Sequence, residues 1–395
     1  MQFFRQCCEI SSNPQHVWET VLIQRSMPKL KVVHIASGDG WGGAERVLSL
    51  LVEGMLAKDS VEVQVLLLNE GRLADLLRSH GVRIRVISEK EHSFWGLVWS
   101  VRQWIRHGGF DVIHTHRYKE VIIAILALIP RLRRLLITVH GLDPWSQLST
   151  ERRLRMWGAI LLARLYGARF IAVSRELAGR LSRRLGQPSV FRIPNPMPVV
   201  PPPKFIDLRA RFGWNPRQPV VGFVGRLEKV KGPDTFLEVA KRGMTCHRSV
   251  FIGSGSMESH LVRRVHSEGL DGHVRFLGEV SNPIEYLRQL DVLAITSRHE
   301  GLPMVLLEAA ACEVPVVAFD VGGIRDVFNG SRALRLVPPG NIAEFSAAIH
   351  DTLADPIEMR NEVRRWAEWV RSNFSLPSVV SSYLSVYRAG LRVSS

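Results

Sequence analysis

The chain has 395 residues, 46% of them apolar, which is too long for one ordinary core and too apolar for a disordered protein. Its four cysteines include no pair at metal-ligand spacing, which excludes a disulfide framework and a cysteine-based zinc site and favours a reducing compartment. The formal net charge is +15, with most of the basic excess in residues 1–200.

The first 26 residues lack the basic segment, apolar core and cleavage site of a secretory signal. We therefore expect residues 1–26 to be an N-terminal extension outside the folded core. The longest apolar run, 121–129, is about half the ~20 residues that a membrane-spanning helix needs, so we interpret it as a buried helix. These features predict a cytoplasmic protein.

Short apolar, β-branched runs alternate with helical stretches along the chain. They lie at 31–36, 61–68, 82–87, 111–115, 135–139 and 169–173, then at 219–224, 248–252, 273–276, 291–296, 314–318 and 334–337. Alternation of this kind predicts parallel sheets with crossover helices. The predicted fold class is α/β, with two Rossmann-like, doubly wound domains that face a central cleft.

The proline-rich segment 195–203 separates the two series of strands and predicts a stiff connector. We place the N-terminal domain at 27–197 and the C-terminal domain at 198–374, followed by a helical segment at 375–395. Open α/β sheets bind ligands at the carboxyl ends of their strands. The cleft between the domains is therefore the expected site.

The loop after the first strand of the second domain reads GRLEKVKG, residues 225–232. Glycines at both ends allow the backbone to approach a ligand, and Arg226 and Lys231 supply positive charge for a diphosphate. Pro233 can open the next helix, whose N-terminus would also face an anion. The alternative is a surface turn with two solvated cations.

A second segment, TSRHEGLPMVLLEAA, places Glu300 in a strand-to-helix loop and Glu308 in the helix that follows. An acidic side chain among apolar neighbours needs a partner, and the hydroxyls of a ribose or hexose would serve. Alternatively, Glu308 caps a neighbouring helix or pairs with an arginine.

Glycines and histidines mark the first domain. Gly38, Gly40 and Gly43 fit the dinucleotide pattern G-x-G-x-x-G, but the acidic residue that this fingerprint requires would be Glu70, which comes late, so a nicotinamide site is disfavoured. His140 follows a buried-looking strand and should face the cleft, although a lone histidine is more often structural.

The motifs GRLEKVKG, EGLPMVLLE and IPNP (193–196) together resemble the retaining glycosyltransferases of the GT-B fold, in particular glycosyltransferase family 4. That family pairs a diphosphate loop with two glutamates at the spacing of Glu300 and Glu308. Further similar segments extend the resemblance from about Lys31 to the C-terminus; they are SGDGWGGAERVL (37–48), HTHRYKE (114–120), VHG (139–141), IGSGSM (252–257) and DVGGIRD (320–326).

The resemblance implies a site and a reaction. Arg226 and Lys231 would neutralise the diphosphate of a UDP- or GDP-sugar, Glu300 would contact the sugar, and Glu308 the ribose. His140 would lie near the transferred sugar, and transfer would retain the anomeric configuration. The other donor-binding residues would be Gly42, Gly43, Gly225, Gly253, Gly301 and Leu302. The acceptor side would include His116, Tyr118 and Lys119.

No D-x-D motif occurs, so we expect neither a metal ion nor a cofactor besides the nucleotide-sugar substrate. The arginine-rich segment 131–192 and the aromatic stretch 94–105 suit an anionic membrane surface bearing a lipid-linked or glycan acceptor. The alternative is a solvated arginine-rich face. By family analogy, the helix at 375–395 crosses back to the N-terminal domain.

The leading hypothesis is thus a transferase of cell-surface polysaccharide or lipopolysaccharide synthesis, in the cytoplasm or peripheral on the inner face of the cytoplasmic membrane. A GT-B sugar-nucleotide epimerase is the second hypothesis. A basic nucleic-acid-binding protein is the third, and the motifs disfavour it. The sequence does not indicate an oligomeric state.

Overall fold

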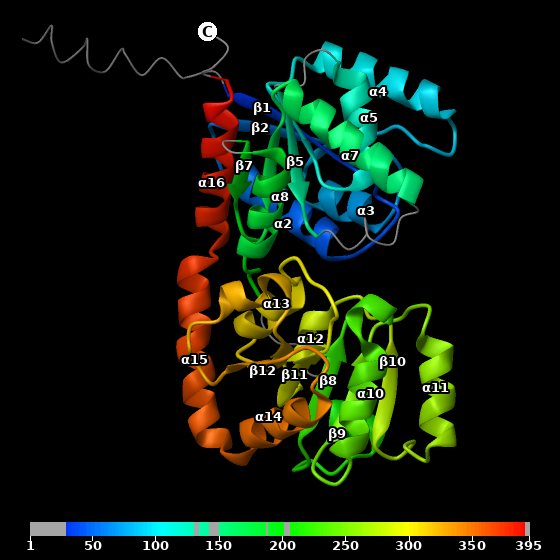
Figure 1. Ribbon diagram of the computed structural model, residues 1–395, viewed down its shortest axis with the longest axis vertical. Coiled ribbons are helices and arrows are strands. Elements are labelled where there is room, and N and C mark those ends of the chain that lie inside the picture. Colours follow the sequence, from blue (N-terminus) through cyan, green and yellow to red (C-terminus); the bar gives the residue numbers. More distant parts are fainter. Residues whose placement is uncertain (1–28, 130–133, 142–149, 187–188, 201–205, 392–395) are drawn as a thin grey trace, which may run out of the picture.

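The computed structural model describes residues 29–129, 134–141, 150–186, 189–200 and 206–391. The extension expected at 1–26 lies outside them. The structure has two parallel sheets, one above the other in Figure 1, with helices interleaved along the chain. The predicted α/β class with two doubly wound sheets is confirmed, and among the described residues no helix is long and apolar enough to cross a membrane.

The first sheet has seven parallel strands in the order β3-β2-β1-β4-β5-β6-β7. They are β1 (Leu30–Ala36), β2 (Val61–Leu67), β3 (Arg83–Val86), β4 (Val112–Thr115), β5 (Leu135–Val139), β6 (Arg169–Ala172) and β7 (Val190–Arg192). Central strands such as β4 and β5 are buried along their whole length, which explains their continuous apolar runs. Strand β7 was not among the predicted strands, because this three-residue edge strand has no fully buried position.

The helices of this half are α2 (Gly43–Leu56), α3 (Arg72–Ser79), α4 (Phe94–Gly108), α5 (Tyr118–Leu128), α7 (Thr150–Leu165) and α8 (Arg175–Leu185). Local sequence sets several of their ends. The Ser93 hydroxyl accepts from the Gly96 amide at the start of α4, and Gly109 ends that helix with a left-handed φ of 60°. The apolar run 121–129 forms most of α5 and is largely buried.

The second sheet has six parallel strands in the order β10-β9-β8-β11-β12-β13. They are β8 (Val220–Val224), β9 (Arg248–Ile252), β10 (Val274–Gly278), β11 (Val292–Ile295), β12 (Val316–Phe319) and β13 (Leu334–Val337). The strand order reverses between β1 and β4 in one sheet and between β8 and β11 in the other, and ligands bind at such switch points.

Helices of the second half connect these strands. They are α9 (Leu208–Phe212), α10 (Pro233–Arg242), α11 (Glu258–Ser267), α12 (Pro283–Leu287), α13 (Met304–Ala311) and α14 (Ile342–Ala354), with short 3-10 turns η2 (Lys229–Lys231) and η3 (Gly322–Val327). The predicted boundary at 197/198 falls in the irregular stretch 193–200 that follows β7. The domain limits themselves stay predictions.

The last two helices run along one side of both halves (Figure 1). The first, α15 (Pro356–Asn373), contacts α13 and α14, whereas α16 (Leu376–Ala389) packs on α2 of the first half. Gly54 of α2 makes this packing possible, because a Cβ atom there would lie 2.7 Å from Val380 Cγ2.

Candidate active site

A cavity of about 1930 Å³ is lined by both halves of the molecule. Its walls are mostly the loops at the carboxyl ends of the strands: those after β1, β4 and β5 on one side, and those after β8, β9 and β11 on the other. The predicted site residues that line the cavity come from both halves, from Gly42 and Gly43 to Glu308.

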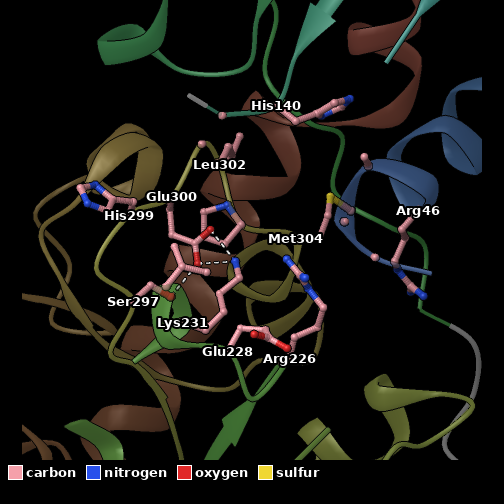
Figure 2. A pocket seen from close by; sticks show the side chains of 18 of the residues that line it. Arg46, His140, Arg226, Glu228, Lys231, Ser297, His299, Glu300, Leu302 and Met304 are labelled. Atoms are coloured by element: carbon pink, nitrogen blue, oxygen red, sulfur yellow. Dashed lines mark hydrogen bonds and ion pairs between the residues drawn. The ribbon is translucent and has the colours of Figure 1, made fainter. Parts of the chain in front are cut away.

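The loop after β8 carries Arg226 and Lys231 to the cavity. Gly232 has a left-handed φ of 67°, and a Cβ atom there would lie 2.1 Å from the carbonyl oxygen of Thr296. Only glycine permits this approach. Arg226 is exposed, and in Figure 2 its side chain extends in the direction of Met304. The loop thus presents a solvent-accessible cation at the cavity.

The loop after β9 is hydrogen-bonded to the loop that carries Arg226. The Glu228 carboxylate accepts hydrogen bonds from the Ser256 amide at 3.0 Å and from the Ser256 hydroxyl at 2.7 Å. These bonds lower the pKa of Glu228. A Cβ atom at Gly253 would lie 2.1 Å from the Gly225 carbonyl oxygen, so the loop after β9 needs glycine where it contacts the backbone of the Arg226 loop.

Lys231 does not stand alone in the cavity. Its Nζ lies 2.7 and 2.8 Å from the two carboxylate oxygens of Glu300, whose side chain is 7% exposed. The Ser297 hydroxyl also donates to Glu300, at 2.7 Å, as Figure 2 shows. Because the ammonium and the carboxylate neutralise each other, a ligand that binds here meets a preformed ion pair.

Glu308 has a partner that the sequence analysis considered only in general terms. It is 6% exposed on α13, and its Oε1 lies 2.6 Å from Arg46 Nε of α2. The Arg46 N–H is not directed at this oxygen, so the contact is an ion pair without hydrogen-bond geometry. Burial raises the pKa of Glu308, and the Arg46 charge opposes that rise. In the sequence, the feature that could have identified Arg46 as a site residue is its position three residues after Gly43 of the glycine loop.

Two helix N-termini meet at the cavity. Gly42 is the extended N-cap of α2, and a Cβ atom at Gly43 would lie 3.8 Å from Met304 Cγ, at the start of α13. Both helix ends bring backbone N–H groups and partial positive charge to the cavity. Together with Arg226, they form a surface suited to an anion.

The loop after β5 reaches the second half of the molecule at His140. A Cβ atom at Gly301 would lie 1.7 Å from the His140 carbonyl oxygen, so glycine is required for this backbone contact. The neighbouring Leu302 is buried, and Asn195 Nδ2 donates to its carbonyl oxygen at 2.7 Å. Asn195 belongs to the IPNP motif, but it was not among the predicted site residues. Burial lowers the pKa of His140 to about 4, so its ring is neutral at pH 7.

Of the predicted acceptor-side residues, His116 and Lys119 both line the cavity, but their surroundings differ. His116 is 4% exposed and is hydrogen-bonded to other histidines, whereas Lys119 is exposed and pairs with Glu89. Tyr118 begins α5, and its side chain lies outside the described part of the structure.

Comparisons with known families match both halves of the chain. Residues 204–369 match the family model of glycosyl transferases group 1, and residues 41–199 match that of glycosyltransferase family 4. The two matches meet at the proline-rich connector.

Two curated relatives illustrate the range of similarity. The chain is 29% identical over 191 residues to D-inositol 3-phosphate glycosyltransferase of Jonesia denitrificans, a match that covers 45% of each chain. It is also 29% identical over 297 residues to phosphatidyl-myo-inositol mannosyltransferase of Mycobacterium leprae, which covers 73% of this chain and 75% of that one. With several of its relatives, including the first, the chain thus aligns over about half of their length.

Among solved structures, Anabaena Alr3699/HepE in complex with UDP and glucose superposes with a TM-score of 0.79. It is 21% identical, and the match covers 91% of this chain and 100% of that one. This likeness shows the fold. The two-sheet architecture, the cleft between the sheets and the two family matches are therefore consistent with one another.

Proposed function

Because the chain belongs to the group 1 glycosyltransferases of the GT-B fold, we propose that it moves a sugar from a nucleotide-sugar donor to an acceptor, with retention of the anomeric configuration. One observation carries this proposal. An exposed arginine, two helix N-termini and two glutamates whose side chains are each 7% exposed, Glu300 and Glu308, line a single cavity between the two sheets. This combination suits a diphosphate flanked by hydroxyl-rich groups.

Each polar group then has a role in binding or leaving-group departure. The donor diphosphate lies between Arg226 and the N-termini of α2 and α13, which stabilise the charge that develops as the nucleotide leaves. Lys231 bridges this diphosphate and Glu300, and Glu300 accepts hydrogen bonds from the sugar hydroxyls. Glu308 accepts from the ribose hydroxyls. Binding in this manner requires no metal ion and no cofactor.

The donor is a UDP- or GDP-sugar. The HepE structure contains UDP and glucose, which supports the uridine nucleotide as the first to be tested. The sugar itself is selected by side chains around the cavity, which differ among proteins of one fold.

The acceptor is a glycan or a lipid-linked sugar, and the M. leprae relative, by its name a mannosyltransferase of a phosphatidyl lipid, supports a lipid. Phe94, Trp95 and Trp99 are exposed on α4, and Leu154 and Leu165 are exposed on α7. Both helices pack on α5. We place this surface against an anionic membrane, on the inner face of the cytoplasmic membrane, in cell-surface polysaccharide or lipopolysaccharide synthesis.

Thermal unfolding in the presence of UDP- and GDP-sugars tests the donor site. A sugar nucleotide that binds the folded state raises Tm. Arg226→Ala should remove this shift, whereas Arg217→Ala, an exposed arginine away from the cavity, should retain it. An unchanged shift in Arg226→Ala would overturn the assignment of the diphosphate site.

Incubation with radiolabelled donor, with and without lipid extracts, distinguishes transfer from epimerisation. Label that moves to an acceptor supports the transferase, and an epimerised donor without acceptor rejects it.

Vesicle sedimentation tests the membrane proposal: Trp95→Ser/Trp99→Ser should lower binding to anionic vesicles. Equal sedimentation of this variant and the unmodified protein would overturn the membrane surface.

A further inference from the structure

Four histidines lie together beneath the cavity. His34 lies in β1, His114 in β4, His116 just after β4, and His140 just after β5. Because β1, β4 and β5 are adjacent parallel strands, residues far apart in sequence meet at one place. His34 and His114 are fully buried, and the ring centroids of His114 and His116 are 4.2 Å apart.

Three of these rings form a hydrogen-bonded series that ends at the cavity. His34 Nδ1 lies 2.9 Å from His116 Nε2, and His116 Nδ1 lies 3.3 Å from His140 Nε2. His116 therefore uses both of its ring nitrogens within the series. His140, which lines the cavity, has only Nδ1 left for a ligand.

The fourth ring belongs to a different set of bonds. His114 Nδ1 lies 2.7 Å from the Tyr387 hydroxyl of α16, and His114 Nε2 lies 2.7 Å from the Thr138 hydroxyl. His34, His114 and His116 are close enough to be considered as metal ligands, with candidate atoms within 4.8 Å of one another. However, these bonds already use both nitrogens of His114, and a hydrogen bond joins the other two rings. The arrangement therefore favours proton sharing over metal binding.

Neutral imidazole has one N–H donor and one acceptor nitrogen. Burial lowers the pKa of His34 to about 3 and that of His140 to about 4, and holds the pKa of His116 well below its usual value. All three rings are therefore neutral at pH 7. If His116 donates at Nδ1, it must accept at Nε2 from His34 Nδ1–H. If it donates at Nε2, it must accept at Nδ1 from His140 Nε2–H. In either case, all three rings adopt the same tautomer.

We propose that His116 and His34 are positioning residues that fix the tautomer of His140, and so decide whether its Nδ1 donates or accepts a hydrogen bond in the cavity. The inference rests on the proposed function only in taking the ligand at Nδ1 to be the donor sugar. The tautomers themselves are a property of the free protein. The far end of the series is closed, since His34 Nε2 has no partner among the described residues.

Nitrogen-15 NMR of the full chain labelled in its histidine rings tests the proposal directly, because the ring ¹⁵N shifts distinguish the two tautomers. Single substitutions assign the signals. We expect His34, His116 and His140 to be all protonated at Nδ1 or all protonated at Nε2. A mixed set, or a His140 ring that exchanges between tautomers in the unmodified protein, would overturn the proposal.

Two variants at His34 separate hydrogen bonding from packing. His34→Phe keeps a ring but cannot bond to His116, whereas the amide of His34→Asn can occupy the position of Nδ1. We expect His34→Phe to change the His140 ring signals and to lower kcat with a smaller effect on KM. His34→Asn should restore both. Matching spectra and rates in these two variants would contradict the proposal.

His114→Asn is the matched control, because His114 is equally buried but lies outside the series. It should lower Tm without changing the His140 tautomer. A change in the His140 signals as large as that in His34→Phe would show that general packing, not the series, sets the tautomer. If no nucleotide sugar is bound, the proposed function fails, but the NMR result still decides this inference.

Discussion

The two glutamates proposed to bind the donor, Glu300 and Glu308, are each paired with a cation in the unliganded protein. Glu300 is held by Lys231, and Glu308 by Arg46. Removing one partner of a buried pair leaves an uncompensated charge, which costs about 3–5 kcal/mol in other proteins. The partial exposure of Lys231 and Arg46 reduces that cost here. These ion pairs therefore offset part of the cost of burying the two carboxylates.

Lys231→Ala should lower both Tm and donor affinity, because it leaves Glu300 buried without its cation. Adding Glu300→Gln removes the unpaired charge, so Lys231→Ala/Glu300→Gln should regain Tm but not the Tm shift that the donor produces. Thermal unfolding with and without UDP-sugar measures both effects. Full donor affinity in Lys231→Ala would contradict the role of Lys231.

Glu120 is a further buried carboxyl group at the cavity. It is 1% exposed, its two oxygens have no hydrogen-bond partner among the described residues, and burial raises its pKa from 4.5 to about 7. Between these values the folded state binds more protons than the unfolded state, so Glu120 makes stability fall as the pH rises from about 4.5 to about 7.

Glu120→Gln should therefore flatten the pH dependence of stability over that range and should make the protein more stable than the unmodified chain at pH 8. Denaturant unfolding at several pH values checks this. Glu344→Gln is a suitable control, because Glu344 is exposed. A steeper loss of stability toward high pH in Glu120→Gln would show that the carboxylate is stabilised by a partner.

At the scale of elements, close packing of α16 on α2 joins the C-terminal helix to the first half. A Cβ atom placed at Gly54 would lie 3.1 Å from Leu376 Cγ and closer still to Val380. Tyr387, fully buried on the same helix, reaches His114 in the core. Gly54 and the Tyr387 hydroxyl therefore both contribute to holding α16, which follows the second sheet in the chain, against the first half.

Gly54→Ala should lower Tm, because the added methyl group displaces α16 from α2, although alanine favours helix by about 1 kcal/mol over glycine. Gly158→Ala in α7 is the matched control, since a Cβ atom there meets nothing within 4 Å. It should raise Tm slightly. Two variants with equal Tm would contradict the close packing of these helices.

For the whole molecule, several contacts join the two halves, and most of them involve residues that line the cavity. Arg46 of α2 pairs with Glu308 of α13, and Arg192 pairs with Asp326 at 3.2 Å. Asn195 and His140 fix the loop at Gly301 and Leu302. Because one wall of the cavity belongs to each half, the relative placement of the halves determines whether the site is complete.

Arg46→Ala should open the cleft of the unliganded protein and weaken donor binding, because it removes an ion pair that joins the halves. Small-angle X-ray scattering should show a larger radius of gyration without donor, and saturating UDP-sugar should restore the compact form. Arg78→Ala, which removes a surface ion pair within one half, should leave the radius of gyration and donor binding unchanged. An unchanged radius in Arg46→Ala would refute this coupling.

The sequence predicted the strands of both sheets, apart from β7, and several of the residues that line the cavity from the second half, among them Arg226, Lys231 and Glu300. Both are local signals. Buried parallel strands need continuous apolar runs, and loops such as 225–232 need glycines wherever their backbone turns or touches another chain segment. These requirements produce patterns in consecutive residues, so the fold class and the family resemblance could be predicted from the sequence.

Only the tertiary structure decided which charges and rings meet. Arg46 and Glu308, Lys231 and Glu300, and His34 and His116 are far apart in sequence, and each pair depends on which strands are neighbours and how the halves face each other. No local pattern specifies such a partner, because long-range pairing follows from strand order and packing. The sequence by itself thus determined the two sheets and their ligand loops, and the tertiary structure determined how the site is neutralised.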